Sequence, residues 1–134
     1  MKDSTPASPS HEESIRTFSS HCVKTFFDQL PTQLDQPWTL DTMARQCGLA
    51  RNQFAIICRK LTNQSPIEYL NTCRITNAIH LLETEKEMNL SQIAKVCGFR
   101  SNQYFSTLFK KMKGFSPSDY RRVSFLPRHP LNQK

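Results

Sequence analysis

A pattern of eight residues occurs twice in this chain, about 50 positions apart. The first copy consists of Leu40, Ala44, Cys47, Gly48, Phe54, Ser65, Pro66 and Tyr69, and the second of Leu90, Ala94, Cys97, Gly98, Phe105, Ser116, Pro117 and Tyr120. The offset is 50 up to the glycine and 51 after it. A pattern that is shared over about 30 residues indicates one supersecondary unit that is used twice.

Each copy of the repeat predicts a helix, a turn and a second helix. In the first copy, apolar residues at helical spacing lead to Gly48, a residue type that favours the left-handed backbone at a helix end. A second apolar pattern then covers residues 51–61. The second copy repeats this arrangement around Gly98, with its second helix at residues 101–112. This is the organisation of a helix-turn-helix.

Two further helices complete the predicted fold. Residues 66–83 predict a helix between the two copies, about 27 Å long at 1.5 Å per residue. Residues 14–30 predict an amphipathic helix whose apolar face would hold Ile15, Phe18, Cys22, Phe26 and Phe27. No segment predicts a strand. We therefore expect an all-α chain with about seven helices, in which a long linking helix joins two helix-turn-helix subdomains.

The expected domain organisation has five parts. Residues 1–13 are polar and are expected to be disordered, and residues 14–65 form the first helix-turn-helix subdomain. The linking helix and its loop occupy residues 66–88. The second subdomain covers residues 89–126, and residues 127–134 are expected to form a flexible tail.

The charge of the chain is concentrated in the two repeated blocks. The 134 residues include 18 Lys and Arg against 11 Asp and Glu, which gives a formal net charge of +7. Residues 38–66 carry four basic side chains against one acidic, and residues 89–134 carry nine against one. The segment between them, residues 67–88, is acidic. This distribution favours two separate surfaces for a polyanion, with nucleic acid ahead of an acidic membrane surface.

Composition argues against several other classes. The five cysteines include no C-x-x-C pair, and the four histidines are scattered, so we expect no metal site and no cofactor. Cys47 and Cys97 are interpreted as small core residues. No apolar run approaches the 18 residues that a membrane span needs, and the first ten residues lack the apolar core of a secretory signal. The expected location is the cytoplasm, in association with the nucleoid.

The second copy and the linking helix together carry a family resemblance. The relevant segments are Ile93–Phe99, Tyr104–Ser106, Phe109–Lys111 and Gly114–Arg122, with Arg74, Ala78, Leu81 and Leu82 on the linking helix. In these residues the chain resembles the DNA-binding domain of the AraC/XylS family of bacterial transcription regulators, over about residues 14–125. The resemblance implies that each unit places its second helix, the recognition helix, in a major groove of double-stranded DNA. The two grooves would be successive ones, roughly 34 Å apart.

The resemblance also implies which side chains read bases. In the second recognition helix these are Asn102, Gln103, Ser106 and Thr107, and in the first they are Arg51, Asn52, Gln53, Ala55 and Ile56. Amides can bond adenine at two positions, and small hydroxyls can bond several base edges. Ala55 and Ile56 can offer only apolar contact, for example to a thymine methyl group. We therefore expect the second unit to discriminate more between bases, and the first either to position the protein or to read a T-rich half-site.

A second set of residues is expected to contact phosphates. Helix starts present unpaired N–H groups and a positive dipole end, and lysines that follow a recognition helix can neutralise the backbone. The expected phosphate contacts are Thr39, Arg45, Lys60, Asn89, Lys95, Ser101, Lys110, Lys111 and Lys113.

The sequence also bears on two function classes other than DNA binding, a protein-interaction module and an enzyme. A protein-interaction module is the alternative, because helix-turn-helix units can bind partners and Ile56 would suit such a contact. An enzyme is not expected: related domains are fused to cysteine alkyl-transfer modules, but the zinc-site spacing and the catalytic motifs are missing here. For a transcription activator, RNA polymerase is a further partner to consider. The sequence indicates no particular small-molecule effector.

Overall fold

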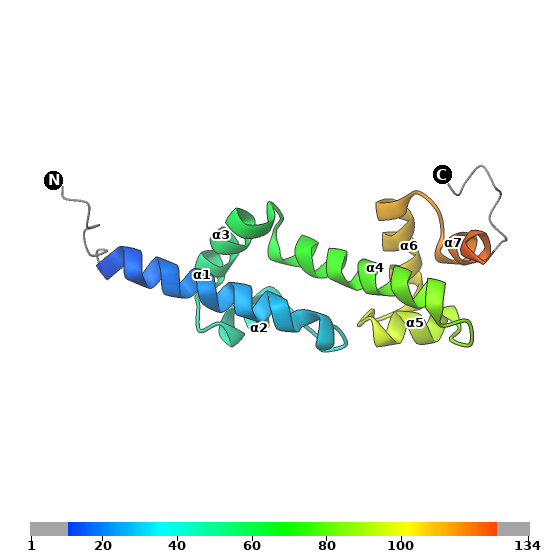
Figure 1. The fold of residues 1–134 in the computed structure, drawn as a ribbon, viewed down its shortest axis with the longest axis horizontal. Helices are drawn as coiled ribbons and strands as arrows, with labels where there is room; N and C mark the ends of the chain where they lie inside the picture. The colour runs from blue at the N-terminus through cyan, green and yellow to red at the C-terminus, as the bar shows by residue number, and fades with distance from the viewer. Residues whose placement is uncertain (1–10, 126–134) are drawn as a thin grey trace. The chain divides into compact units, whose positions relative to one another are not determined.

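The computed structural model describes residues 11–125 (Figure 1), and over this range it confirms the predicted all-α fold. Seven α-helices and one short 3-10 helix occur there, and no strand. They are α1 (His11–Gln29), η1 (Leu30–Thr32), α2 (Leu40–Gln46), α3 (Arg51–Thr62), α4 (Pro66–Thr84), α5 (Leu90–Val96), α6 (Asn102–Lys113) and α7 (Pro117–Ser124). Residues 11–13, which were expected to be disordered, begin α1. Residues 1–10 and the expected tail at 127–134 lie outside the described residues.

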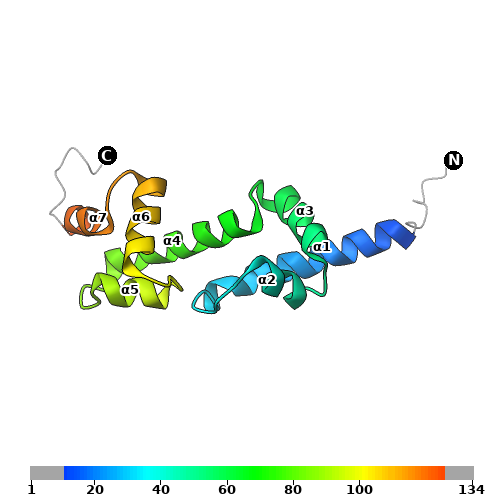
Figure 2. The same ribbon diagram turned by 180° about the vertical axis from the view of Figure 1, so that it is seen from behind.

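The described residues form two compact units. Unit 1 contains residues 11–30 and 38–69, and unit 2 contains residues 31–37 and 70–125. In unit 1, α3 packs against both α1 and α2; in unit 2, α6 packs against α5 and α7, as both views of the ribbon show (Figures 1 and 2). The first four residues of α4 belong to unit 1 and the rest of that helix to unit 2.

Aromatic rings form the centre of unit 1. Phe54 of α3 is fully buried, and its ring lies edge-on to Phe26 at 6.2 Å and to Phe27 at 6.1 Å. Trp38 packs edge-on against Phe26 at 5.1 Å, and Tyr69 lies 4.2 Å from Phe27. Because α3 contributes the central ring, burial of Phe54 determines which face of α3 remains exposed. Trp38, just before α2, thus has a packing role in this unit.

Unit 2 has an apolar core formed by α4, α5, α6 and the turn between α5 and α6. The buried residues are Ile75, Ala78, Leu82, Ile93, Ala94, Cys97, Phe99, Phe105 and Phe109. Phe105 and Phe109 lie one turn apart on α6, and their rings are 5.8 Å apart in an edge-on arrangement. Each fully buried aromatic side chain contributes about 1.5–3 kcal/mol by leaving water. These two residues therefore fix the rotation of α6 about its own axis.

The start of α1 differs from the prediction. Ile15 and Phe18 were expected on the packed apolar face, but 45% and 68% of their surface is exposed. Phe26 and Phe27 are buried as expected. A 19-residue helix is about 28 Å long, whereas α3 has only 12 residues with which to cover it. The apolar spacing indicated a helix correctly but did not show where its covering partner ends.

Both copies of the repeat end their helices in the same backbone conformation. Gly48 and Gly98 have φ of +68° and +93°, so each ends the first helix of its copy as predicted. The recognition helices end at Asn63 (φ +61°) and at Gly114 (φ +91°), again in the left-handed region. A glycine adopts this conformation without steric strain, whereas Asn63 is a tolerated exception.

Candidate nucleic-acid interface

The second recognition helix, α6, presents polar side chains beside the face that holds its buried phenylalanines. Its N-cap is Ser101, whose Oγ accepts a hydrogen bond from the Tyr104 N–H at 3.0 Å. Asn102, Gln103 and Thr107 are exposed, and Ser106 is half-buried. At 3.6 residues per turn, the four predicted base-reading positions fall within about 140° of one another around the helix. The structure thus gathers all four on one side of α6.

The first recognition helix, α3, is less uniform. Arg51, Asn52 and Ile56 are exposed, whereas Gln53 and Ala55 are half-buried. Its N-cap, Ala50, makes no side-chain hydrogen bond. Three of the five predicted base-reading side chains are therefore exposed, and the other two are partly covered.

Arg51 has a partner that the sequence did not indicate. Its Nε lies 2.9 Å from Oδ1 of Asp41, on α2. Both side chains are more than half exposed, so the pair contributes little to stability. It does hold the guanidinium toward α2, and a base contact by Arg51 would have to compete with this ion pair.

Apolar surface follows the polar start of α3. Ile56 is 57% exposed and lies beside Ala55 and Pro66 in an open groove of about 330 Å³. The remaining lining comes from Arg59, Lys60 and Ser65. The groove combines a methyl-rich floor with basic side chains, which suits either a thymine methyl group beside phosphates or an apolar side chain of a partner.

All nine predicted phosphate-contacting residues are exposed, but three of them, Thr39, Asn89 and Ser101, already use their side chains as helix caps. The N–H of Thr39 donates to Thr42 Oγ1 at 2.8 Å, and the N–H of Asn89 donates to Gln92 Oε1 at 2.8 Å. Their side-chain oxygens accept in return from the N–H groups of Thr42 and Gln92. These capping boxes stabilise α2 and α5 and leave the Thr39 and Asn89 amides occupied.

Five basic side chains lie in the last turns of the two recognition helices, whereas Arg45 and Lys95 lie in the last turns of α2 and α5. Lys110, Lys111 and Lys113 occupy the last turn of α6, and Arg59 and Lys60 the last turn of α3. Cations there also favour the helix dipole. Arg100, which was not assigned a role from the sequence, is exposed in the turn between α5 and α6, directly before Ser101. The sequence could have indicated a phosphate contact here, because Arg100 directly precedes Ser101 within the basic segment 89–134.

Side chains of α7 hold the turn that leads into α5. Arg121 donates to the carbonyl oxygens of Glu85 and Met88, and the Tyr120 hydroxyl donates to Glu83. The hydrogen bond to Glu83, together with partial burial, raises the pKa of Tyr120 to about 12. These contacts hold residues 83–88 against α7. Because α5 begins directly after this segment, they also hold the start of the second helix-turn-helix.

Two of the cysteines, Cys47 and Cys97, occupy equivalent positions in the two copies of the repeat. Cys97 is buried in unit 2, as expected, whereas Cys47 is half-buried, with its Sγ 3.9 Å from the carbonyl oxygen of Cys22. Burial raises the pKa of both thiols to about 11, so they remain protonated near neutral pH. Within residues 11–125 no three His, Cys, Asp or Glu side chains are grouped to hold a metal ion. Over the same range, no helix is long and apolar enough to span a bilayer.

Comparison with known proteins places this fold in a family. A family profile described as a helix-turn-helix domain matches residues 43–123. The HTH-type transcriptional regulator AlkR of Acinetobacter baylyi is 36% identical over 90 residues, which are 67% of this chain and 29% of that protein. The HTH-type transcriptional activator RhaR of Salmonella schwarzengrund is 34% identical over 109 residues, 75% of this chain and 37% of the relative. The chain thus spans about a third of the length of these relatives.

Solved structures agree with this placement. The DNA-binding domain of AdpA, solved in complex with a target DNA, superposes with a TM-score of 0.72 at 29% identity, covering 75% of this chain and 90% of that one. An AraC-type regulator from Chromobacterium violaceum shares the fold, with a TM-score of 0.71 at 21% identity, covering 84% of this chain and 99% of its own. With its two copies of the helix-turn-helix, the chain belongs to the AraC/XylS family of DNA-binding transcription regulators.

Proposed function

We propose that this chain binds double-stranded DNA sequence-specifically, as the DNA-binding part of a transcription regulator that acts at the bacterial nucleoid. α3 and α6 would each enter a major groove, and the two grooves would be successive ones on a single duplex. The observation that carries the proposal is the two-sided character of α6. Phe105 and Phe109 are buried in the core of unit 2, while Asn102, Gln103 and Thr107 of the same helix are exposed.

The chemistry of α6 favours discrimination between bases. The amides of Asn102 and Gln103 can each donate to and accept from adenine in the major groove, and each good pair of this kind is worth about 1–3 kcal/mol against the wrong base. Thr107 adds a hydroxyl. Lys110 and Lys111 follow within one turn and are exposed, where they can neutralise phosphates that border the groove.

The chemistry of α3 favours a thymine-rich half-site. Ile56 is exposed, and beside Ala55 it can contact thymine methyl groups. Asn52 remains available for an adenine. Arg51 is held by Asp41, so its contribution depends on release from that ion pair.

The test is a titration of the chain with a duplex obtained by random-site selection, compared with a duplex of shuffled sequence. Neutralising about 6–8 phosphates should give a slope of log K against log salt near −5 to −7. The selected duplex should also bind far more tightly than the shuffled one. Equal affinity for both duplexes, or no retention of either at low ionic strength, would overturn the proposal.

A protein partner is the second candidate function, and the exposed Ile56 groove favours it. For a transcription activator, that partner would be RNA polymerase. An Ile56→Ser variant separates the two uses of this surface. If Ile56 reads DNA, the variant loses its preference at one position of the selected site; if it binds polymerase, DNA binding stays unchanged while stimulation of transcription by purified polymerase falls.

A further inference from the structure

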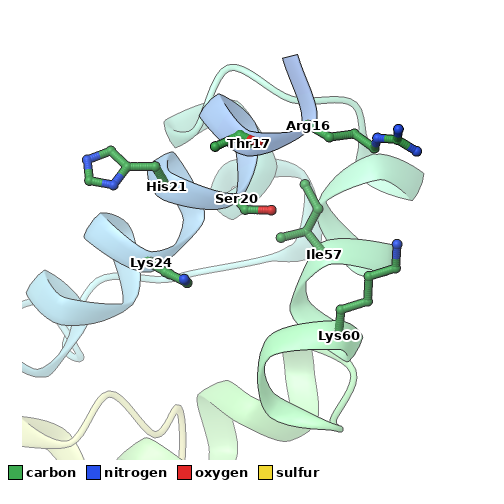
Figure 3. Close-up of a pocket in the computed structure, with 7 residues that line it drawn as sticks. All are labelled: Arg16, Thr17, Ser20, His21, Lys24, Ile57 and Lys60. Carbon is green, nitrogen blue, oxygen red and sulfur yellow. The ribbon is translucent and has the colours of Figure 1, made fainter. Parts of the chain in front are cut away.

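Unit 1 contains a groove between α1 and α3 that lies outside both predicted base-reading faces. Its volume is about 380 Å³, and Figure 3 shows the side chains that line it. Six of its seven residues are polar or basic: Arg16, Thr17, Ser20, His21, Lys24 and Lys60, with the buried Ile57 as the apolar member. Of these, only Lys60 was expected from the sequence to contact DNA.

The groove is cationic, and no acidic side chain of the described residues lines it. Its positive charges are those of Arg16, Lys24 and Lys60. The acidic residues of α1 lie at its two ends, at Glu12, Glu13 and Asp28. The ion pairs at Arg51, Arg59 and Arg122 do not involve Arg16, Lys24 or Lys60.

The arrangement of the cations is elongated. Arg16 and Lys24 are eight residues apart on α1, which is about 12 Å along the helix axis. Lys60 reaches the groove from α3, and in Figure 3 it extends to the same side as Arg16, with Ser20 and Ile57 between the helices. A duplex carries one phosphate per strand about every 3.4 Å of its axis, so this row of charges matches several consecutive phosphates.

We propose that this groove binds the phosphodiester backbone of DNA, with Arg16 and Lys24 of α1 and Lys60 of α3 each contacting a phosphate. The proposal rests on the proposed function and extends it to a helix outside both helix-turn-helix units. The hydroxyls of Thr17 and Ser20 can donate to the same phosphate oxygens.

The position of Lys60 argues for DNA as the source of the phosphates. It lies one turn after Ile56 on the helix that would enter the major groove, so a strand bordering that groove passes close to it. A free phosphate ion would instead favour donors that converge on one point, whereas these cations are spread along α1.

The experiment measures the salt dependence of binding to the selected duplex for Arg16→Gln, Lys24→Gln and the double variant. Each lost phosphate contact should reduce the magnitude of the log–log slope by about 0.9. Affinity near physiological salt should fall roughly twofold to fivefold per substitution, the range for exposed charge pairs. The ratio of affinities for selected and shuffled duplexes should stay the same, because phosphates carry no sequence information.

Matched variants separate this effect from a general loss of charge or of folding. Lys86→Gln removes one positive charge beyond the end of α4, among Glu83, Glu85 and Glu87, and should leave the slope unchanged. Arg16→Lys keeps the charge and should restore the slope. If the double variant retains the wild-type slope while the wild type still prefers its selected site, the groove proposal is wrong and the proposed function stands. If the wild type binds no duplex, both are wrong.

Two further arms identify the source of the phosphate. Single methylphosphonate linkages are placed along the selected duplex; one of them should weaken the wild type but not the double variant. In parallel, inorganic phosphate is titrated while amide shifts of α1 are followed. Saturable binding of inorganic phosphate at Ser20 and His21, with no methylphosphonate position that distinguishes the two proteins, would overturn the assignment to DNA.

Discussion

The Nη2 atom of Arg74 lies 2.9 Å from the carbonyl oxygen of Leu34, although 40 residues separate the two in the chain. The Nε of the same guanidinium donates to this oxygen at 3.1 Å, and Nη2 also donates to Gln36 at 2.7 Å. Only 8% of Arg74 is exposed. One buried side chain of α4 thus holds the segment 31–37 in unit 2 through three hydrogen bonds.

Replacing Arg74 by Leu should lower the free energy of unfolding by about 2–4 kcal/mol, because the carbonyls of Leu34 and Gln36 lose charged donors in a buried setting. Urea denaturation measures the change. Arg74→Lys should recover part of the loss, since one ammonium group cannot reproduce the planar fork. Arg122→Gln, at an exposed arginine, should change stability by less than about 0.5 kcal/mol. A similar effect at both arginines would contradict the assigned role.

Gly98 should tolerate substitution far less than its repeat equivalent, Gly48. A Cβ at Gly98 would lie 2.0 Å from the Leu34 carbonyl oxygen and 2.7 Å from Arg74 Nε, whereas a Cβ at Gly48 would meet nothing within 4 Å. Both alanine variants carry the strain of positive φ, about 1–2 kcal/mol. Gly98→Ala should therefore cost about 3 kcal/mol or more, and Gly48→Ala only the strain. Thermal unfolding of the two variants compares them, and equal costs would show that the segment 31–37 moves aside freely.

The ends of the two recognition helices provide a matched pair of substitutions. Asn63 and Gly114 both adopt left-handed backbone at the end of α3 and α6. Asn63→Gly should raise the free energy of unfolding by about 0.5–1 kcal/mol, and Gly114→Asn should lower it by a similar amount. Denaturant titration reads out both. Opposite signs are the expected result, and destabilisation by Asn63→Gly would show that the Asn63 side chain has a role of its own.

Substitutions on α6 should separate base reading from phosphate contact. Asn102→Ala or Gln103→Ala should cost about 1–3 kcal/mol on the selected duplex and relax the preference at one position. Lys110→Ala should weaken binding to all sequences alike and reduce the salt slope by about 1. Competition assays with a panel of single-base variants give both quantities. Identical behaviour of the two kinds of variant on selected and random DNA would refute these roles.

Cys97 should make stability depend on alkaline pH. Burial raises the pKa of its thiol from the ordinary 9.0 to about 11 in the folded chain. Below pH 9 the thiol is protonated whether the chain is folded or not, so its contribution is fully present there. The contribution is then lost as the pH rises from 9 through 11. Urea denaturation at pH 8 to 11 should show a smaller decline for Cys97→Ala than for the wild type, and parallel declines would refute the prediction.

Local patterns in the sequence were sufficient to predict the two helix-turn-helix units. Gly48 and Gly98 lie within a few residues of the helix ends they produce, and Phe54 and Phe105 show the buried face of each recognition helix directly. Pairing between side chains of different helices was not predictable in this way. The ion pair of Arg51 with Asp41 is an example, because it depends on how α3 packs against α2.

The groove beside α1 illustrates the same limit. Its lining combines Arg16 with Lys60, which are 44 positions apart in the chain. Sequence spacing within α1 correctly placed Phe26 and Phe27 in the core. It also predicted burial of Phe18, because helical periodicity shows which residues share a face but not how far a neighbouring helix reaches.

The two copies differ at the N-cap residue directly before their recognition helices, which is Ala50 in one and Ser101 in the other. A serine N-cap stabilises the first turn of a helix by about 0.5–2 kcal/mol, whereas alanine has no side-chain oxygen that could cap it. The opening turn of α3 should consequently fray more often, with faster amide hydrogen exchange at Asn52 and Gln53 than at Gln103 and Tyr104. One copy thus has a preformed first turn, while the first turn of the other is expected to be pliable enough to adapt to more than one surface.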